Sequence, residues 1–422
     1  MPAKTRVTAA VGGLLAAVAL AGCGDGDDST TQPGTPQNIV FWDTSGPNET
    51  PVFGKVAKDC GTKGGYQVTV EQVAFDQALN NYKTAAQGGQ GPDVFRAEVA
   101  WVSQLAKNGL VMDLTDTPLG KDTSDFLDVP LGSTQFEGKT YGVPQVTDTL
   151  ALFYNKKLLA DAGVEPPTTW DEVKAAAAKL GGERTLFINN DAYYALPFIY
   201  GAGGDLLDTE AKKIVVNSAE NVTALETAKG LLDAKAAQTA LDPGNSYTNM
   251  QAAFTTGQVA MVINGPWSVA DYQKGEAFQA DPDNLGIAPV PGPRAGSGSA
   301  PVGGHDYVIR QGTKSTDSAI KFVECMAGTE SQVAIAKELG LLPTRKSAYD
   351  NADVKAQPIV TAFKPVVEKA HARAWIPEGG QLFDPLKTAY ADVLSGAKDA
   401  KTALDEVAKA YKDTVVPDYS TN

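Results

Sequence analysis

The stretch Ala253-Phe-Thr-Thr-Gly-Gln-Val-Ala-Met-Val-Ile-Asn-Gly-Pro-Trp267 combines a helix end, a buried strand and a turn. Gly257 is predicted to end a helix that begins near Thr248-Asn-Met-Gln251, a candidate capping box. The uncharged run Val259–Ile263 predicts a buried strand. The Asn-Gly-Pro turn that follows leads to Trp267 at the strand's end. This order of elements indicates an α/β fold.

The N-terminal third repeats the alternation of strand and helix. Strands are predicted at 38–42, 67–70 and 93–95, with helical spacing of apolar residues at 52–60 and 76–86. Strand, helix, strand, helix, strand predicts a parallel sheet covered by helices.

The same alternation continues downstream. A strand is predicted at 150–154, and a capping box at Thr169-Trp-Asp-Glu172 opens a helix that runs to Leu180. A strand at 186–188 follows, and helical spacing recurs at 222–232. The chain of 422 residues exceeds the usual size of one hydrophobic core, so two lobes are expected.

Two later segments differ from each other. Leu404, Val407, Ala408 and Tyr411 have the spacing of an amphipathic helix. The segment 288–304, APVPGPRAGSGSAPVGG, is too rich in proline and glycine for a helix and is disfavoured as a central strand. It is predicted to connect the lobes or to form a loop near a cleft.

The N-terminus predicts export. Lys4 and Arg6 precede an apolar run that is too short to span a bilayer, and Leu20-Ala-Gly-Cys23 resembles a bacterial lipobox. Residues 1–22 would then be a lipoprotein signal peptide, and 23–37 a lipidated Cys23 with a solvated tether. The alternative is an ordinary secretory peptide with a chance cysteine.

Cys60 and Cys325 remain, in an oxidising compartment, as a disulfide or as two buried free thiols. Neither spacing nor composition predicts a metal site or a cofactor. A net charge of −14 argues against nucleic acid and anionic lipid surfaces as partners.

Enzyme signatures are weak. The sequence has no GxGxxG, Walker or G-x-S-x-G motif. The pair His305-Asp306 has no nucleophile signature beside it, which favours a structural or ligand-contact role. Among 50 acidic residues nothing singles out a catalytic carboxylate pair.

A binding site has better support, because aromatic residues at predicted strand ends and turns alternate with short polar residues. Each ring alone is explained by core packing, but the set suits a sugar, which presents an apolar face and a rim of hydroxyls. The rings are Trp42, Tyr154, Tyr193, Tyr194, Trp267, Trp375 and Phe383, and the polar groups are Asp43, Asp148, Asn155, Asp191, Asn264 and Glu378.

Several short sequence motifs resemble those of the maltose/maltodextrin-binding proteins of ATP-driven (ABC) sugar importers. The opening stretch, which ends in Ile263-Asn-Gly-Pro-Trp267, is the closest match. The others follow in the family's order from about residue 38 to the C-terminus: Gly91-Pro-Asp93-Val, Tyr141-Gly-Val-Pro144, Leu152-Phe-Tyr-Asn-Lys156 and Pro167-Thr-Thr-Trp170.

The resemblance implies an α/β, two-lobed periplasmic-binding-protein fold, with parallel-rich sheets flanked by helices and a ligand cleft between the lobes. By position, the first lobe would hold 38–146 and 307–350, and the second 151–302 and 357–422. Crossovers near 147–150, 303–306 and 351–356 would form the hinge.

The resemblance also assigns ligand contacts. Trp267 and Tyr193 would stack on sugar rings, and Asp148 and Asp191 would accept hydroxyl hydrogen bonds. Phe383 stands where the family has a stacking tryptophan. The family's aromatic-Ala-x-Asp-Arg run reads Arg96-Ala-Glu98-Val-Ala, so Arg96 and Glu98 remain as polar contacts without the stacking ring. The remaining predicted ligand-binding residues are Asp43, Trp375 and Glu378.

The implied function is a non-enzymatic, monomeric substrate-binding lipoprotein. It would bind maltose, maltodextrin or a related sugar and deliver it to the permease subunits of an ABC importer. The lipid on Cys23 would hold it at the outer face of the bacterial cytoplasmic membrane. Alternatives are the same fold with a non-sugar solute such as an oligopeptide or polyamine, and an extracellular glycosidase or sensor lipoprotein.

Overall fold

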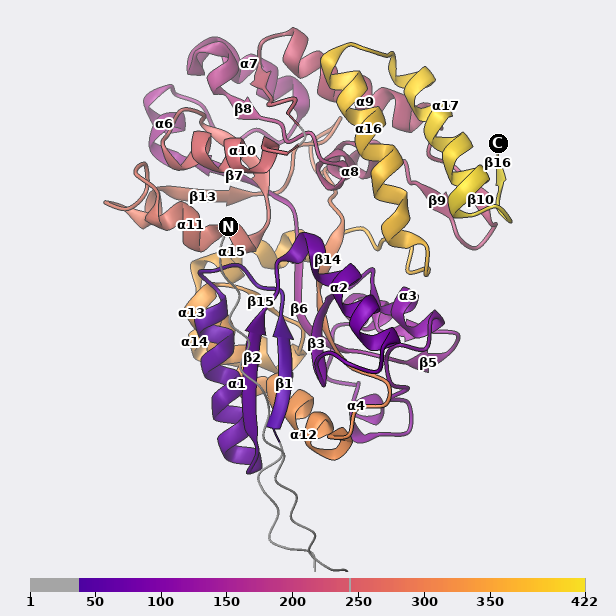
Figure 1. Ribbon diagram of the computed structural model, residues 1–422. Helices are drawn as coiled ribbons and strands as arrows, with labels where there is room; N and C mark the ends of the chain where they lie inside the picture. The colour runs from indigo at the N-terminus through magenta and orange to yellow at the C-terminus, as the bar shows by residue number, and fades with distance from the viewer. Residues whose placement is uncertain (1–37, 243, 422) are drawn as a thin grey trace, which may run out of the picture. The chain divides into compact units, whose positions relative to one another are not determined.

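The computed structural model describes residues 38–242 and 244–421, so the predicted leader, Cys23 and the whole of the predicted tether lie outside the described residues. Two mixed sheets organise the described chain (Figure 1). The first has the strand order β15-β6-β14-β3-β1-β2, and the second β11-β8-β12-β7-β13. We call each sheet with its helices the first lobe and the second lobe.

The first lobe is built from residues of the N-terminal third and of the segment after residue 302. Its strands are β1 (Asn38–Asp43), β2 (Gln67–Gln72), β3 (Val94–Glu98), β6 (Val143–Thr149), β14 (Val302–Ile309) and β15 (Leu342–Pro343). Its helices are α1 (Thr50–Gly64), α2 (Phe75–Gln87), α3 (Val102–Lys107), α4 (Pro118–Lys121), α5 (Asp128–Ser133), α12 (Thr316–Met326) and α13 (Thr329–Leu339). A small hairpin joins β4 (Gln135–Phe136) to β5 (Lys139–Thr140).

The second lobe holds the middle and the C-terminal end of the chain. Its strands are β7 (Ala151–Asn155), β8 (Leu186–Phe187), β11 (Ala237–Gln238), β12 (Met261–Asn264) and β13 (Leu285–Ala288). Its helices are α6 (Lys156–Asp161), α7 (Trp170–Leu180), α8 (Ala192–Gly201), α9 (Ala219–Asp233), α10 (Ser246–Thr255), α11 (Val269–Lys274), α15 (Pro358–Val367), α16 (Phe383–Ser395) and α17 (Ala400–Ala410). A small sheet of β9 (Leu207–Asp208), β10 (Lys213–Ile214) and β16 (Ser420–Thr421) lies at its edge, and α14 (Ala352–Lys355) precedes α15.

Strand pairing agrees with the predicted parallel sheet in the N-terminal third, where β1 pairs in parallel with β2 and β3. The pairs β11–β8 and β8–β12 are also parallel. The pairs β3–β14, β14–β6, β6–β15, β12–β7 and β7–β13 are antiparallel. Two of the five strand pairs in the first sheet and two of the four in the second are therefore parallel. The antiparallel part of each sheet contains β6, β7 and β14, which lie at the passages between the sheets.

Alternation along the strands places apolar side chains on both faces of the first sheet. On β1, Phe41 belongs to the cluster covered by α1 and α12, while Trp42 packs with the cluster of α2 and α3. On β3, Val94 and Phe95 divide in the same way. Successive side chains of a strand point to opposite faces of the sheet, and helices cover both faces here. Both sets of side chains are therefore apolar, which explains the short apolar runs in the sequence.

Helix boundaries test two of the predicted caps. The Thr169 hydroxyl and the Glu172 carboxylate form the predicted capping box of α7. The second candidate is wrong, because α10 begins at Ser246 and Thr248 already lies inside its first turn. Gly257 follows the end of α10 with a φ of 72°, a left-handed conformation that suits glycine at a helix stop.

The prediction that the segment 288–304 is a connection or loop is also partly wrong. Its last three residues belong to β14, which is a central strand of the first sheet. A Cβ atom on Gly303 would lie 2.1 Å from the Asp148 Oδ1 atom, and one on Gly304 would lie 2.2 Å from the Val146 carbonyl oxygen. Glycine is therefore needed here because two elements approach closely, not because the strand ends.

A disulfide joins Cys60 of α1 to Cys325 of α12, with a Cα–Cα distance of 5.8 Å. The structure thus resolves the alternative left open by the sequence in favour of a bond. No helix among the described residues is long and apolar enough to cross a bilayer.

We expect the double substitution of Cys60 and Cys325 to serine to lower the free energy of unfolding by about 2–5 kcal/mol, because the bond closes a long loop in the unfolded chain. The sequence separation of the two cysteines is 265 residues. Urea unfolding of both proteins measures the difference. A reducing agent should destabilise the parent and leave the double variant unchanged; equal stability of the two oxidised proteins would contradict the account.

Candidate ligand-binding site

The two lobes meet at a buried ion pair. The guanidinium of Arg373, which lies between α15 and α16, donates to Glu98 Oε1 at the carboxyl end of β3. The other carboxylate oxygen of Glu98 accepts a hydrogen bond from the Ala100 N–H at 2.9 Å. Only 9% of Arg373 is exposed, so this pair joins the lobes where water is largely excluded.

Aromatic side chains of the second lobe surround the guanidinium. Its central carbon lies 5.7 Å from the ring centre of Tyr193, 5.5 Å from that of Trp375 and 5.8 Å from that of Phe383. Tyr193 is in turn 6.4 Å from Trp267. We call Tyr193, Trp267, Trp375 and Phe383 the ring cluster. Such distances allow cation–π attraction, which holds Arg373 in place between the rings.

Asp148 lies beside the ring cluster near the end of β6. A Cβ atom on Gly303 would come within 2.1 Å of Asp148 Oδ1 and 2.6 Å of the Tyr193 hydroxyl oxygen, so both side chains converge over this glycine. Desolvation by burial raises the pKa of Asp148 to about 7, against the opposing charge of Arg373. Asp148 is thus a carboxyl group that can donate or accept a hydrogen bond near neutral pH.

Polar residues of the first lobe gather at the carboxyl ends of β1 and β3. Arg96 donates from Nε to Gln145 Oε1 at 2.9 Å and from Nη1 to Thr44 Oγ1 at 3.2 Å. Asp43 accepts hydrogen bonds from the backbone N–H and the hydroxyl of Ser45. Ligands of α/β folds bind at this edge of a sheet.

Glu49 joins this group from the start of α1. Burial raises the pKa of its carboxyl group, and the charge of Arg96 opposes that shift.

Three contacts between the lobes lie farther out. Lys107 of α3 forms an ion pair of 2.5 Å with Glu378. The Asn48 amide donates to Asp271 of α11, and Lys274 donates to Asn48 Oδ1 at 3.0 Å. These contacts are partly exposed, so each contributes little to stability by itself.

Asp191 has a structural role in addition to any contact with a ligand. It is the N-cap of α8, where Oδ1 accepts a hydrogen bond from the Tyr193 N–H at 3.1 Å. Its other oxygen lies 3.0 Å from Lys387 Nζ. Asp191 therefore fixes the start of the helix that carries Tyr193.

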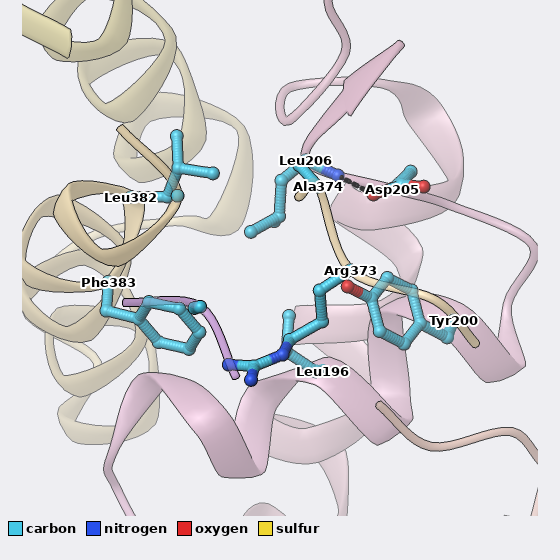
Figure 2. A pocket seen from close by; sticks show the side chains of 10 residues that line it. Leu196, Tyr200, Asp205, Leu206, Arg373, Ala374, Leu382 and Phe383 are labelled. Atoms are coloured by element: carbon cyan, nitrogen blue, oxygen red, sulfur yellow. Dashed lines mark hydrogen bonds between the residues drawn. The ribbon is translucent and has the colours of Figure 1, made fainter. Parts of the chain in front are cut away.

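The space left beside Arg373 is small. Figure 2 shows the Arg373 guanidinium between Phe383 and Tyr200, and Ala100 of the first lobe lines the same cavity. The cavity volume is about 10 Å³, which is room for roughly one water molecule. The cavity beside Arg373 is therefore too small for a sugar ring in this arrangement of the lobes.

Comparison with known proteins identifies the family. A model of the bacterial extracellular solute-binding proteins matches residues 55–362. The chain belongs to this family. This solute-binding protein is 28% identical over 377 residues to a maltooligosaccharide ABC transporter solute-binding lipoprotein of Streptococcus pneumoniae, covering 86% of this chain and 85% of that one. It is 26% identical over 418 residues to the diacetylchitobiose binding protein DasA of Streptomyces coelicolor, covering 95% and 96%.

Solved structures of similar proteins agree with this family assignment. The GacH receptor of Streptomyces glaucescens, described unliganded and in complex with acarbose and an acarbose homologue, is 40% identical with a TM-score of 0.87, covering 92% of this chain and 100% of that one. The maltotriose binding protein of Thermus thermophilus, at 24% identity, has a TM-score of 0.78 over 89% and 100% of the chains. The predicted two-lobed fold is confirmed, and family membership confirms a binding protein rather than an enzyme.

The structure brings most of the predicted site residues of this solute-binding protein to the boundary between the lobes. Tyr193, Trp375, Phe383 and Glu98 surround Arg373, with Asp148 and Trp267 next to Tyr193. Arg96 and Asp43 lie in the first-lobe polar group. Glu378 lies farther out in its ion pair with Lys107. Among the described residues, no group of three or more His, Cys, Asp or Glu side chains is arranged to hold a metal ion.

Sequence reasoning missed Arg373, Glu49, Asn48 and Lys107. Arg373 stands two residues before Trp375, in a segment with an aromatic ring and no helical period. The same pattern of a ring beside a polar residue, which predicts Trp375 as a ligand contact, also fits the neighbouring Arg373.

The raised pKa of Asp148 makes stability depend on pH. In the unfolded chain the pKa of an aspartate is about 3.9, so the folded protein binds this proton more tightly. The resulting stabilisation is complete below about pH 4 and is lost as pH rises through the folded pKa of about 7. We expect Asp148→Asn to remove a slope of up to about 1.4 kcal/mol per pH unit from the unfolding free energy between about pH 5 and pH 7.

Urea unfolding of the parent and of Asp148→Asn at several pH values measures this slope. Burial raises the pKa of Glu49 and Asp306 as well and lowers that of His305, but these groups are present in both proteins. The difference between the two curves therefore isolates Asp148. Parallel curves across this range would show that Asp148 stays ionised in the folded protein.

Proposed function

We propose that this protein is the substrate-binding lipoprotein of an ABC importer, that it captures an oligosaccharide of the maltodextrin type between its lobes, and that it delivers the sugar to the permease. The observation that carries the proposal is the ring cluster around Arg373, with Asp148 and Glu98 beside it. Rings cover the apolar face of a sugar, and carboxyl and guanidinium groups pair with its hydroxyls.

The relatives support a carbohydrate ligand and differ in which one. The Streptococcus pneumoniae relative is named for maltooligosaccharides, DasA for diacetylchitobiose, and the GacH receptor is described with acarbose. Maltodextrins and acarbose are the first ligands to compare, because the GacH receptor has 40% identity with this chain.

The mechanism uses motion of the lobes. We assign the first lobe to 38–146 and 307–350, the second to 151–302 and 357–422, and the hinge to 147–150, 303–306 and 351–356. Pairing of Val302 with Thr149 and of Gly303 with Asp148 ties two of these crossovers together. A bound sugar draws the lobes together, and the closed form is the one that the importer recognises.

Membrane attachment completes the proposal. Residues 1–22 are the signal peptide, the lipid is carried by Cys23, and 24–37 form the tether to the outer face of the cytoplasmic membrane. The name of the Streptococcus pneumoniae relative, a lipoprotein, supports the anchor. The protein acts as a monomer, since each chain carries both lobes of the site.

Calorimetric titration with maltose, maltotriose and acarbose tests the ligand class. The expected result is one-to-one binding without hydrolysis. Trp267→Ala should weaken binding at least about tenfold, because it removes a ring that desolvates the sugar face. Trp267→Phe, which keeps a ring, is the matched control and should lose less.

Absence of binding to all three sugars would contradict the carbohydrate proposal and favour a non-sugar solute. Release of shorter sugars by catalytic amounts of protein would favour the glycosidase instead. Unchanged affinity in folded Trp267→Ala would remove this residue from the site.

A further inference from the structure

An aromatic pair stands on the first lobe, apart from the ring cluster. Phe75 opens α2 just after β2, and Trp101 precedes α3 just after β3. Their ring centres are 5.1 Å apart. Trp101 stacks on the fully buried Phe95 at 6.0 Å with an interplanar angle of 9°. The pair is thus anchored on the core, while 45% of Phe75 is exposed.

The pair lies at the edge of the sheet where ligands bind. The parallel strands β2 and β3 both end there, so the segments that follow them meet at their carboxyl ends. The residue before Trp101, Ala100, lines the cavity that also contains Arg373 and Phe383. The first-lobe pair therefore adjoins, along the chain, a residue that lines the cavity between the lobes.

His305 supplies the polar group beside the pair. Its ring meets Phe75 edge-on, with centres 6.0 Å apart. Within the described chain, neither of its two buried ring nitrogens has a hydrogen-bond partner. His305 lies directly opposite Glu98 in the antiparallel β14–β3 pair, so both side chains stand on the same face. Because Glu98 reaches Arg373 of the second lobe, His305 also faces the space between the lobes.

Unpaired buried nitrogens are unfavourable unless a ligand or water satisfies them. Desolvation, together with the charges of Arg96 and Arg373, lowers the pKa of His305, so the ring is neutral. A neutral imidazole offers one donor and one acceptor, which matches a sugar hydroxyl pair.

We propose that Phe75 and Trp101 form a further sugar subsite on the first lobe, with His305 as its hydrogen-bonding residue, and that this subsite makes the protein prefer oligosaccharides to disaccharides. The inference rests on the proposed function and adds the chain length of the ligand. It also replaces the stacking ring that the first lobe lacks at Arg96-Ala-Glu98.

Calorimetric titration of the purified full-length protein with maltose and maltotetraose tests the subsite. Phe75→Ala should weaken maltotetraose binding about tenfold, and maltose binding less than about twofold, because maltose is satisfied by the ring cluster alone. Phe75→Tyr keeps the ring and should bind both sugars within about twofold of the parent. Since 45% of Phe75 is exposed, thermal unfolding should show that all three proteins fold alike.

The outcomes separate the two proposals. If the parent binds neither sugar, both the carbohydrate function and the subsite are wrong. If the parent binds maltotetraose and Phe75→Ala binds it equally well, the subsite alone is overturned. Equal losses for maltose and maltotetraose would overturn the claim about chain length.

Discussion

The ion pair between Arg373 and Glu98 is the interaction on which the site depends. It joins the lobes in a place with little water, and removing one partner of a buried pair costs about 3–5 kcal/mol because the other charge stays buried and unpaired. The guanidinium also holds the faces of Tyr193, Trp375 and Phe383 around itself. A ligand that binds beside this pair must therefore offer hydrogen bonds of its own to the two charged groups. A polyhydroxylated sugar meets that requirement, whereas an apolar ligand would leave both charges without partners.

The two crossing strands β6 and β14 fix where that chemistry takes place. Their pairing brings Asp148 beneath Tyr193 and sets His305 next to Glu98. Glycine at 303 makes the first of these approaches possible. The passages between the sheets adjoin these two strands, since β6 is followed by β7 of the second sheet and β14 is preceded by β13 of the second sheet.

The two-lobed fold was predicted correctly, since strand and helix periods and the segments around Trp267 and Tyr193 are local signals. Of the seven predicted rings, the structure gathers Tyr193, Trp267, Trp375 and Phe383 in the ring cluster. Tyr154, Tyr194 and Trp42 lie in or against the hydrophobic cores instead. Arg373 was missed because its role depends on contacts with residues far away in the sequence. Asp191 shows another limit of predicting a residue's role from the sequence. An aspartate at a helix start can cap the helix or bind a ligand, and both need the same residue at the same place. The false cap at Thr248 has a related cause, since the spacing of a capping box also occurs inside helices.

A crystal structure of the protein grown with maltotriose tests the central claim most directly. We expect sugar density between the lobes, with one ring against Trp267 or Tyr193 and hydroxyls within hydrogen-bond distance of Arg373, Glu98 or Asp148. Density for the sugar on the outer surface of one lobe, with the Arg373–Glu98 contact unchanged, would contradict it.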